Sequence, residues 1–183
     1  MIRRTTSKLA LCFTLLTLFV SPLGNAASKQ EINARVKETM ESFYSHSLAG
    51  KQLAKQAAGI LVFPKVIKAG FLFGGEYGEG ALMVNRKIVD YYATAGASFG
   101  FQAGAQFMSQ IVLFMDKESL EKFRQSEGWK VGVDGSVAIA ETGTGTDIDT
   151  QTAKQKIIGF VFSNKGLMFN LSLEGSKFTK IER

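Results

Sequence analysis

The chain has 183 residues, room for one domain of ordinary size, and carries 22 Lys and Arg, 16 Asp and Glu, one Cys and one His. A lone cysteine excludes an internal disulfide and a multi-thiolate metal site, and a lone histidine argues against histidine-rich zinc sites and serine–histidine triads. We therefore expect a protein that is not an enzyme, with no catalytic residue, no metal and no cofactor.

The first 26 residues have the order of a secretory signal peptide: a basic end, an apolar stretch over residues 9–20, and the small residues Gly24-Asn25-Ala26. This order predicts cleavage after Ala26 and a single domain over 27–183. A retained membrane anchor is disfavoured, because the apolar stretch is shorter than the roughly 20 residues that span a bilayer. Cleavage removes three basic residues, so the net charge falls from +6 to 19 − 16 = +3. This mild charge does not call for a nucleic-acid partner. From the signal peptide we expect an exported, periplasmic protein.

Helical signals open the predicted domain. Ser28 and Glu31 form a capping-box pattern, and apolar residues then recur at spacings of three and four up to about Leu48. Gly50 is predicted to break this helix, and a second short helix is predicted over 51–58. A mid-chain helix is predicted to start at Asp116, a good N-cap residue.

Between and after these helices the apolar period changes to two. Strands are predicted over 60–63, 69–73, 80–84, 88–93, 97–103, 110–115, 129–133 and 136–140, then a polar loop over 141–152 and a hairpin from 156–162 and 167–174. Many glycines interrupt these strands, and glycine in a strand favours bending or close backbone packing. The predicted fold is α+β, with a curled, barrel-like antiparallel sheet.

Two acidic groups offer alternative chemistry. Asp147 and Asp149, near Glu141, could bind calcium, although the acids and glycine of an EF-hand are missing and a solvated loop is favoured. Glu76 and Glu79 could serve a hydrolase, but no nucleophile and base accompany them.

A basic segment is the more informative feature. No acid occurs between Glu41 and Glu76, while four lysines fall there beside the apolar residues 60–63. We expect this segment to contact anionic phospholipid, with these candidate residues: Lys51, Lys55, Lys65, Lys68 and Phe71. At about 1 kcal/mol per lysine the charges alone give about 4 kcal/mol, or millimolar affinity, so apolar insertion or several copies would be required. The alternative is an ordinary solvated lysine face.

Three motifs resemble those of the SYLF family of lipid-binding, YSC-type domains. Residues 57–71, continued by Gly74-Gly75-Glu76-Tyr77-Gly78-Glu79-Gly80, resemble its opening signature, and 98–106 and 167–175 resemble its central and closing motifs. The motifs occur in the family's order and cover nearly all of the predicted domain. The chain is similar to the stand-alone exported bacterial branch.

The resemblance implies non-enzymatic binding to phospholipid head groups through the basic N-terminal part of the domain, at a membrane surface of the bacterial envelope. An envelope structural protein, working through protein contacts and possible homo-oligomers, is the main alternative. Light scattering distinguishes the two, because a strict monomer excludes the second.

Overall fold

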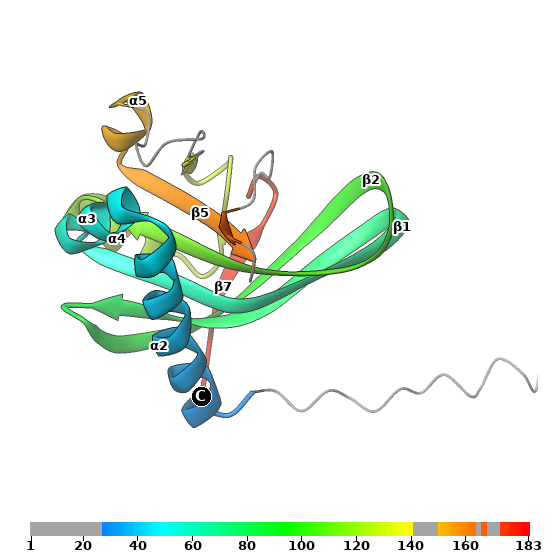
Figure 1. Ribbon diagram of the computed structural model, residues 1–183, viewed down its shortest axis with the longest axis horizontal. Helices are drawn as coiled ribbons and strands as arrows, with labels where there is room; N and C mark the ends of the chain where they lie inside the picture. The colour runs from blue at the N-terminus through cyan, green and yellow to red at the C-terminus, as the bar shows by residue number, and fades with distance from the viewer. Residues whose placement is uncertain (1–26, 141–149, 164–165, 168–172) are drawn as a thin grey trace, which may run out of the picture.

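The computed structural model describes residues 27–140, 150–163, 166–167 and 173–183 (Figure 1). The predicted signal peptide and residues 141–149, with the candidate calcium ligands, lie outside these ranges. Within them the chain forms four helices and a seven-stranded sheet, antiparallel except where β4 runs parallel to β5. The sheet is strongly curled in Figure 1, so the predicted α+β class is confirmed. No helix in the described ranges is both long and apolar enough to cross a membrane.

Helix α2 (Lys29–His46) begins where the sequence predicts, with Ser28 as its N-cap. The Glu31 amide donates to Ser28 Oγ at 3.2 Å, which satisfies one of the open donors of the first turn. The Glu31 carboxylate instead pairs with Arg35 one turn later, at 2.6 Å. One face of α2 is buried, through these side chains: Ile32, Val36, Thr39, Met40 and Phe43.

Helix α3 (Leu48–Gln56) begins three residues earlier than predicted, and Gly50 lies inside it instead of ending the first helix. Ser47 caps α3, since its Oγ accepts from the Gly50 amide at 2.9 Å. Gly50 is needed here for close packing: a Cβ would lie 2.5 Å from the Phe43 ring. The sequence signal was a glycine, but its role is to bring α3 against α2.

The strands predicted separately between residues 60 and 115 are joined into two long strands, β1 (Gly59–Val84) and β2 (Lys87–Phe114), which pair along their whole length. Both strands turn back on themselves, at the right of Figure 1, near a register shift between Gly70 and Leu72. The predicted boundaries were wrong because the glycines bend these strands without ending them. At Gly80, β1 packs so closely on itself that a Cβ would collide with Val62 O.

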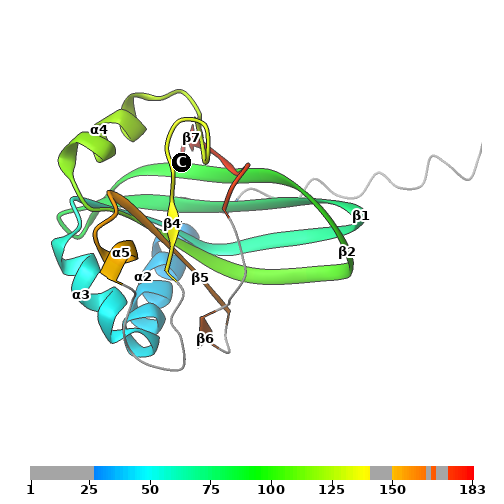
Figure 2. The same cartoon turned by 90° about the horizontal axis from the view of Figure 1, so that it is seen from above.

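Alternation along β1 divides the apolar side chains between two cores. Leu61 and Phe63 belong to an interior core, which also contains Phe123, Trp129 and other residues enclosed by the curled sheet. Val62, between them in the chain, faces the second core, where α2 and α3 pack on the outside of the sheet. In Figure 2 these two helices lie on one side of the hairpin and α4 on another.

The rest of the chain completes the sheet. Helix α4 (Lys117–Gln125) starts after the predicted N-cap Asp116, whose Oδ1 accepts from the Ser119 amide at 2.7 Å. The other elements are β3 (Trp129–Lys130), β4 (Ala138–Ile139), α5 (Thr150–Ala153), β5 (Ile157–Ser163), β6 (Gly166–Leu167) and β7 (Lys177–Ile181). The predicted hairpin appears as β5 paired with β6, and residues 168–172 lie outside the described ranges. Strand β7 was not predicted.

Candidate functional site: a basic cleft between α2, α3 and the β1–β2 turn

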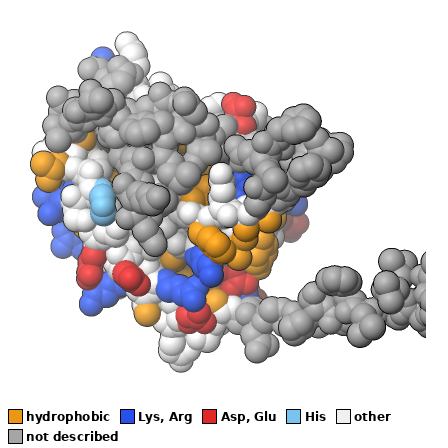
Figure 3. Space-filling view, turned by 45° about the vertical axis from the view of Figure 1, so that its right-hand side comes forward, with side chains coloured by type: hydrophobic (Ala, Val, Ile, Leu, Met, Phe, Trp, Pro, Cys, Tyr) orange, Lys and Arg blue, Asp and Glu red, His pale blue; other side chains and the backbone are white. Residues whose placement is uncertain are grey.

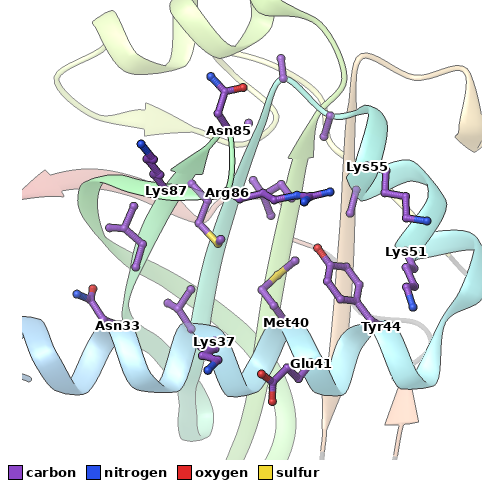
Figure 4. Close-up of a pocket in the computed structure, with 18 residues that line it drawn as sticks. Asn33, Lys37, Met40, Glu41, Tyr44, Lys51, Lys55, Asn85, Arg86 and Lys87 are labelled. Carbon is purple, nitrogen blue, oxygen red and sulfur yellow. The ribbon is translucent and has the colours of Figure 1, made fainter.

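A cleft of about 870 Å³ lies between α2, α3 and the turn that joins β1 to β2 (Figure 4). Five cationic side chains line it, against one acidic side chain, Glu41. The cations come from four parts of the chain: Lys37 on α2, Lys51 and Lys55 on α3, Arg86 in the turn, and Lys87 at the start of β2. We call this feature the basic cleft.

The five cations keep their charge available for a ligand. Among the described residues, none of them forms an ion pair within 4 Å, although seven such pairs occur elsewhere. In Figure 4 the Glu41 side chain points away from Arg86, on the opposite side of the α2 ribbon. The cleft is therefore a concentration of uncompensated positive charge.

The outer surface is different. On the face shown in Figure 3, basic and acidic side chains lie side by side, and hydrophobic side chains gather in a patch next to them. Exposed pairs at helical spacing, such as Lys122 with Glu118 at 2.7 Å, illustrate this arrangement. Such pairs contribute little to stability, but they cancel charge locally.

Arg86 occupies the most demanding position in the cleft. Asn85 and Arg86 form the two-residue hairpin turn, with φ of 50° and 64°. Positive φ at both central residues is typical of a type I′ turn, where glycine is the usual second residue. An arginine there costs roughly 1–2 kcal/mol of backbone strain, and strain of this kind concentrates at functional sites. In Figure 4 the Arg86 side chain extends from the turn toward α3.

Tyr44 lies between two of these cations. Its hydroxyl points toward the Arg86 side chain in Figure 4, and the Lys51 Nζ lies 6.0 Å from its ring centroid. Burial raises the pKa of the Tyr44 phenol, and the positive charge of Arg86 opposes this by lowering it. The neutral phenol is thus a hydrogen-bond donor or acceptor at the mouth of the cleft.

Most of the rest of the lining is apolar, with Asn33 and Asn85 as polar exceptions. Between the cations it consists mainly of Val36, Met40, Ala54, Ala57, Ala58, Ile60, Met83 and Ile88. Two methionines give this surface flexibility, because unbranched thioether side chains adapt to irregular shapes. Positive charge around an apolar floor suits an amphipathic anion better than a free inorganic ion.

The cleft brings together only part of the predicted lysine segment. Lys51 and Lys55 lie one turn apart on α3 and both line it. Lys65 lies six residues along β1 from the cleft-lining Gly59, a distance of roughly 20 Å at strand spacing. Its Nζ is 5.0 Å from the Phe107 ring centroid.

Lys68 does not line the cleft. Along β1, Ile67 is exposed while its neighbours Val66 and Lys68 are buried and half-buried, so Lys68 points to the opposite face from Ile67. Phe71 lies in β1, and its side chain lies outside the part that the structure describes. Three cations and the tyrosine, in contrast, were missed by sequence reasoning: Lys37, Arg86, Lys87 and Tyr44. A two-residue turn after Val84 was the available signal, since such a turn places Arg86 and Lys87 at the sheet edge beside α2.

The two carboxylates considered for hydrolysis are held in structural contacts. Glu76 accepts from Ser176 Oγ at 2.5 Å. Glu79 accepts from the Tyr77 hydroxyl at 2.8 Å and pairs with Arg183 at 2.5 Å. Each carboxylate therefore fastens β1 to a segment near the C-terminus or to a neighbouring side chain.

Comparison with known proteins bears on the family of the chain. The family model Ysc84, described as "Las17-binding protein actin regulator", matches residues 95–182. This match supports the predicted resemblance to the SYLF family over 88 of the 183 residues of the chain. Protein YSC84 of Saccharomyces cerevisiae is 28% identical over 131 residues, covering 67% of this chain and 27% of the yeast protein. SH3 domain-containing protein PJ696.02 of Schizosaccharomyces pombe is 29% identical over 128 residues, covering 63% and 29%.

The matched region and the cleft occupy different parts of the chain. The chain spans less than a third of the length of either fungal relative. The residues matched by the family model begin at residue 95, after Ile88, the last residue that lines the cleft. The cleft must therefore be judged on its own geometry.

Proposed function

We propose that this chain binds anionic phospholipid through the basic cleft, without catalysing a reaction, at a membrane surface in the bacterial periplasm. The observation that carries the proposal is the set of five cations around an apolar floor, none of which forms an ion pair with another residue that the structure describes. The lipid's phosphate would lie at the cationic rim, near Arg86 and α3. The start of an acyl chain or the glycerol backbone would cover the floor.

The magnitudes favour a lipid in a membrane over a free phosphate. Five cations at about 1 kcal/mol each give about 5 kcal/mol, which corresponds to a Kd in the upper micromolar range. Covering apolar surface adds about 25 cal/mol per Å² removed from water. Only a ligand with both parts gains both contributions.

Co-sedimentation with vesicles tests the proposal. We expect binding to phosphatidylglycerol-rich vesicles and little binding to phosphatidylcholine vesicles. Lys51→Gln/Lys55→Gln removes about 2 kcal/mol and should weaken binding about 30-fold. The matched control is Lys65→Gln/Lys68→Gln, which makes the same change of charge outside the cleft and should weaken binding only several-fold. Equal binding to both vesicle types, or equal loss in the two variants, contradicts the assignment to the cleft.

A protein partner is the second candidate. The matching family model is described as a Las17-binding actin regulator, and one relative is an SH3 domain-containing protein, which favours contacts with other proteins. Exposed apolar side chains at Phe107, Ile67 and Tyr77 provide a surface for such contacts. Light scattering over a range of concentrations tests self-association, and a strict monomer excludes it.

A further inference from the structure

The first residue of the predicted mature domain lies against a nearly buried carboxylate. The Ala27 backbone nitrogen donates to Glu79 Oε2 at 3.1 Å. The Glu79 side chain is only 10% exposed, and its other oxygen is held by Arg183 and by the Tyr77 hydroxyl. The second oxygen of this carboxylate therefore accepts only from the Ala27 nitrogen among the described residues, and signal-peptide cleavage would convert that nitrogen into a free amine.

Cleavage would change the charge of that nitrogen. Hydrolysis of the 26–27 peptide bond by a peptidase of the signal-peptidase type consumes one water. It leaves a carboxylate on Ala26 and an amine on Ala27, protonated at neutral pH. In the uncleaved chain Ala27 offers one neutral N–H donor, whereas in the cleaved chain it offers an ammonium with three. A charge-assisted hydrogen bond then replaces a neutral donor on the same carboxylate.

We propose that cleavage after Ala26 creates an ion pair between the new Ala27 ammonium and Glu79, and that this pair locks the processed N-terminus onto the sheet. The inference rests on the export proposed above. It assigns Glu79 a role as receptor for the processed end, in place of the catalytic role considered from sequence.

The ion pair should stabilise the fold because the folded chain already desolvates Glu79. Glu79 is desolvated in the folded chain whether or not cleavage occurs, so the ammonium gains attraction without burying a further carboxylate. Without Glu79, a new positive charge next to the N-terminus of α2 would be unfavourable, because it opposes the helix dipole. Glu79 converts this unfavourable charge into a stabilising contact.

The contact also bears on the basic cleft. Ala27 packs against the core that joins α2 to the sheet. Nearby, the Lys29 Nζ lies 5.6 Å from the Tyr91 ring centroid, and the Tyr91 hydroxyl donates to Asn33 Oδ1 at 2.8 Å. These contacts fix the first turns of α2, and the same helix supplies one wall of the cleft. Processing would therefore stabilise the wall of the binding site.

A double-mutant cycle tests the ion pair. Both hydrophobic cores are built from residue 32 onward, apart from the partly buried Ala27, so a chain that begins at Ala27 contains them complete. One chain is released from a cleavable fusion with Ala27 as its free end, and the matched chain carries Gly-Ser before Ala27. Each is made with Glu79 and with Glu79→Gln. We expect the extension to lower the melting temperature by about 3–6 °C with Glu79 and by less than about 1 °C with Gln.

The coupling is the readout, since Glu79→Gln also weakens the contacts to Arg183 and Tyr77. An extension that lowers the melting temperature equally in both backgrounds overturns the proposal. Should the Gln variant fail to fold, the pKa of the Ala27 amine in the unmutated chain decides. Competitive acetylation followed by mass spectrometry should place it about one unit above the ordinary 7.7–8.0, a tenfold change in proton affinity. An ordinary value overturns the ion pair.

The pH dependence has a defined direction. A raised pKa for the ammonium means that its stabilisation is complete below about pH 7.7 and is lost as the pH rises through the folded-state pKa. Among the described residues, the charged and titratable groups linked to this site are Glu79, its partners Tyr77 and Arg183, and the neighbouring pair Lys29 and Tyr91. The stability difference between the free-end and extended chains should therefore disappear at alkaline pH.

The outcomes are separable from those of the proposed function. The mass of the protein recovered after expression of the full chain with its leader shows whether cleavage occurs after Ala26. Vesicle binding measures the lipid contact, whereas the pKa of the Ala27 amine measures the ion pair directly. If the amine pKa is raised but the protein does not bind vesicles, only the lipid proposal is refuted. If the protein binds vesicles but the amine pKa is ordinary, only the ion pair is refuted.

Discussion

The basic cleft and the bend of the β1–β2 hairpin both carry lysines from one acid-free segment, yet the fold treats them differently. In the cleft, Lys51 and Lys55 join three cations from elsewhere around a concave apolar floor. Near the bend, Lys65 lies over Phe107, which is 57% exposed, and Lys68 points to the other face of the strand. A run of lysines in sequence therefore does not predict a cluster of charge in space. One turn of helix α3 brings its two lysines together, whereas the alternation of side chains along β1 separates the other two.

The backbone differs between the two regions as well. In the cleft half of the hairpin, β1 packs directly on itself, with Gly80 against Val62 O. Nearer the bend, Gly75 has more room: the closest atom to a Cβ there would be Gly96 O, at 3.7 Å. Glycine is therefore required at Gly80, near the cleft, but tolerates substitution at Gly75, near the bend.

The largest expected effect on stability comes from adding a side chain where β1 packs on itself. Gly80→Ala forces a Cβ into the Val62 backbone, which cannot move as a side-chain end can, and should lower the free energy of unfolding by about 3 kcal/mol. Gly75→Ala, the matched control, should leave it unchanged or raise it by about 0.5 kcal/mol. Urea denaturation followed by the fluorescence of the buried Trp129 measures both. Equal losses in the two variants would mean that the two halves of the hairpin are equally packed.

A smaller effect, with opposite signs for stability and binding, is expected at the turn of the cleft. Arg86→Gly relieves about 1–2 kcal/mol of strain and costs about 0.5–1 kcal/mol in chain entropy, so the unfolding free energy should rise by about 0.5 kcal/mol. Loss of one cation should weaken binding to anionic vesicles about fivefold. A variant that binds unchanged would show that Arg86 does not contact the lipid.

Asn85→Gly provides the control for this prediction. It changes the neighbouring turn residue, also at positive φ, without changing the charge of the cleft. Asparagine tolerates this conformation better than arginine, so the gain in stability should be smaller, and vesicle binding should stay the same. Weaker binding in this variant would assign the Arg86→Gly effect to turn geometry.

The helices and most of the strand positions were predictable because local signals determine them. Ser28 and Asp116 cap helices as their side chains predict, and the apolar stripe of α2 is the face that is buried. The joining of strands was not predictable, since glycine both ends and bends strands and only the packing on Val62 distinguishes the two. Half of the cleft was missed for a similar reason: Arg86 is distant in sequence from Lys51, and only the hairpin turn brings them to one cavity.

The smallest expected effect is on the pKa values of two tyrosines, Tyr92 in the interior and Tyr44 in the cleft. Burial raises the pKa of Tyr92 to about 12, with Asp90 adding to the rise and Arg124 opposing it. Tyr92 is buried, and its hydroxyl has no hydrogen-bond partner among the described groups. Because the folded-state pKa is raised, the stabilisation is complete below pH 10 and is lost as the pH rises from 10 to about 12.

Tyr44 should respond to the cleft while Tyr92 does not. Burial raises the Tyr44 pKa and Arg86 lowers it, so Arg86→Gly should raise it further, and a bound anion that offsets the guanidinium should do the same. Carbon-13 NMR titration of labelled tyrosine rings, with and without a short-chain phosphatidylglycerol, measures both changes, and Tyr92 serves as the internal reference. A Tyr44 pKa that the lipid leaves unchanged would place the bound phosphate away from Arg86. The bend would then become the better candidate for the lipid contact, despite its scattered charges.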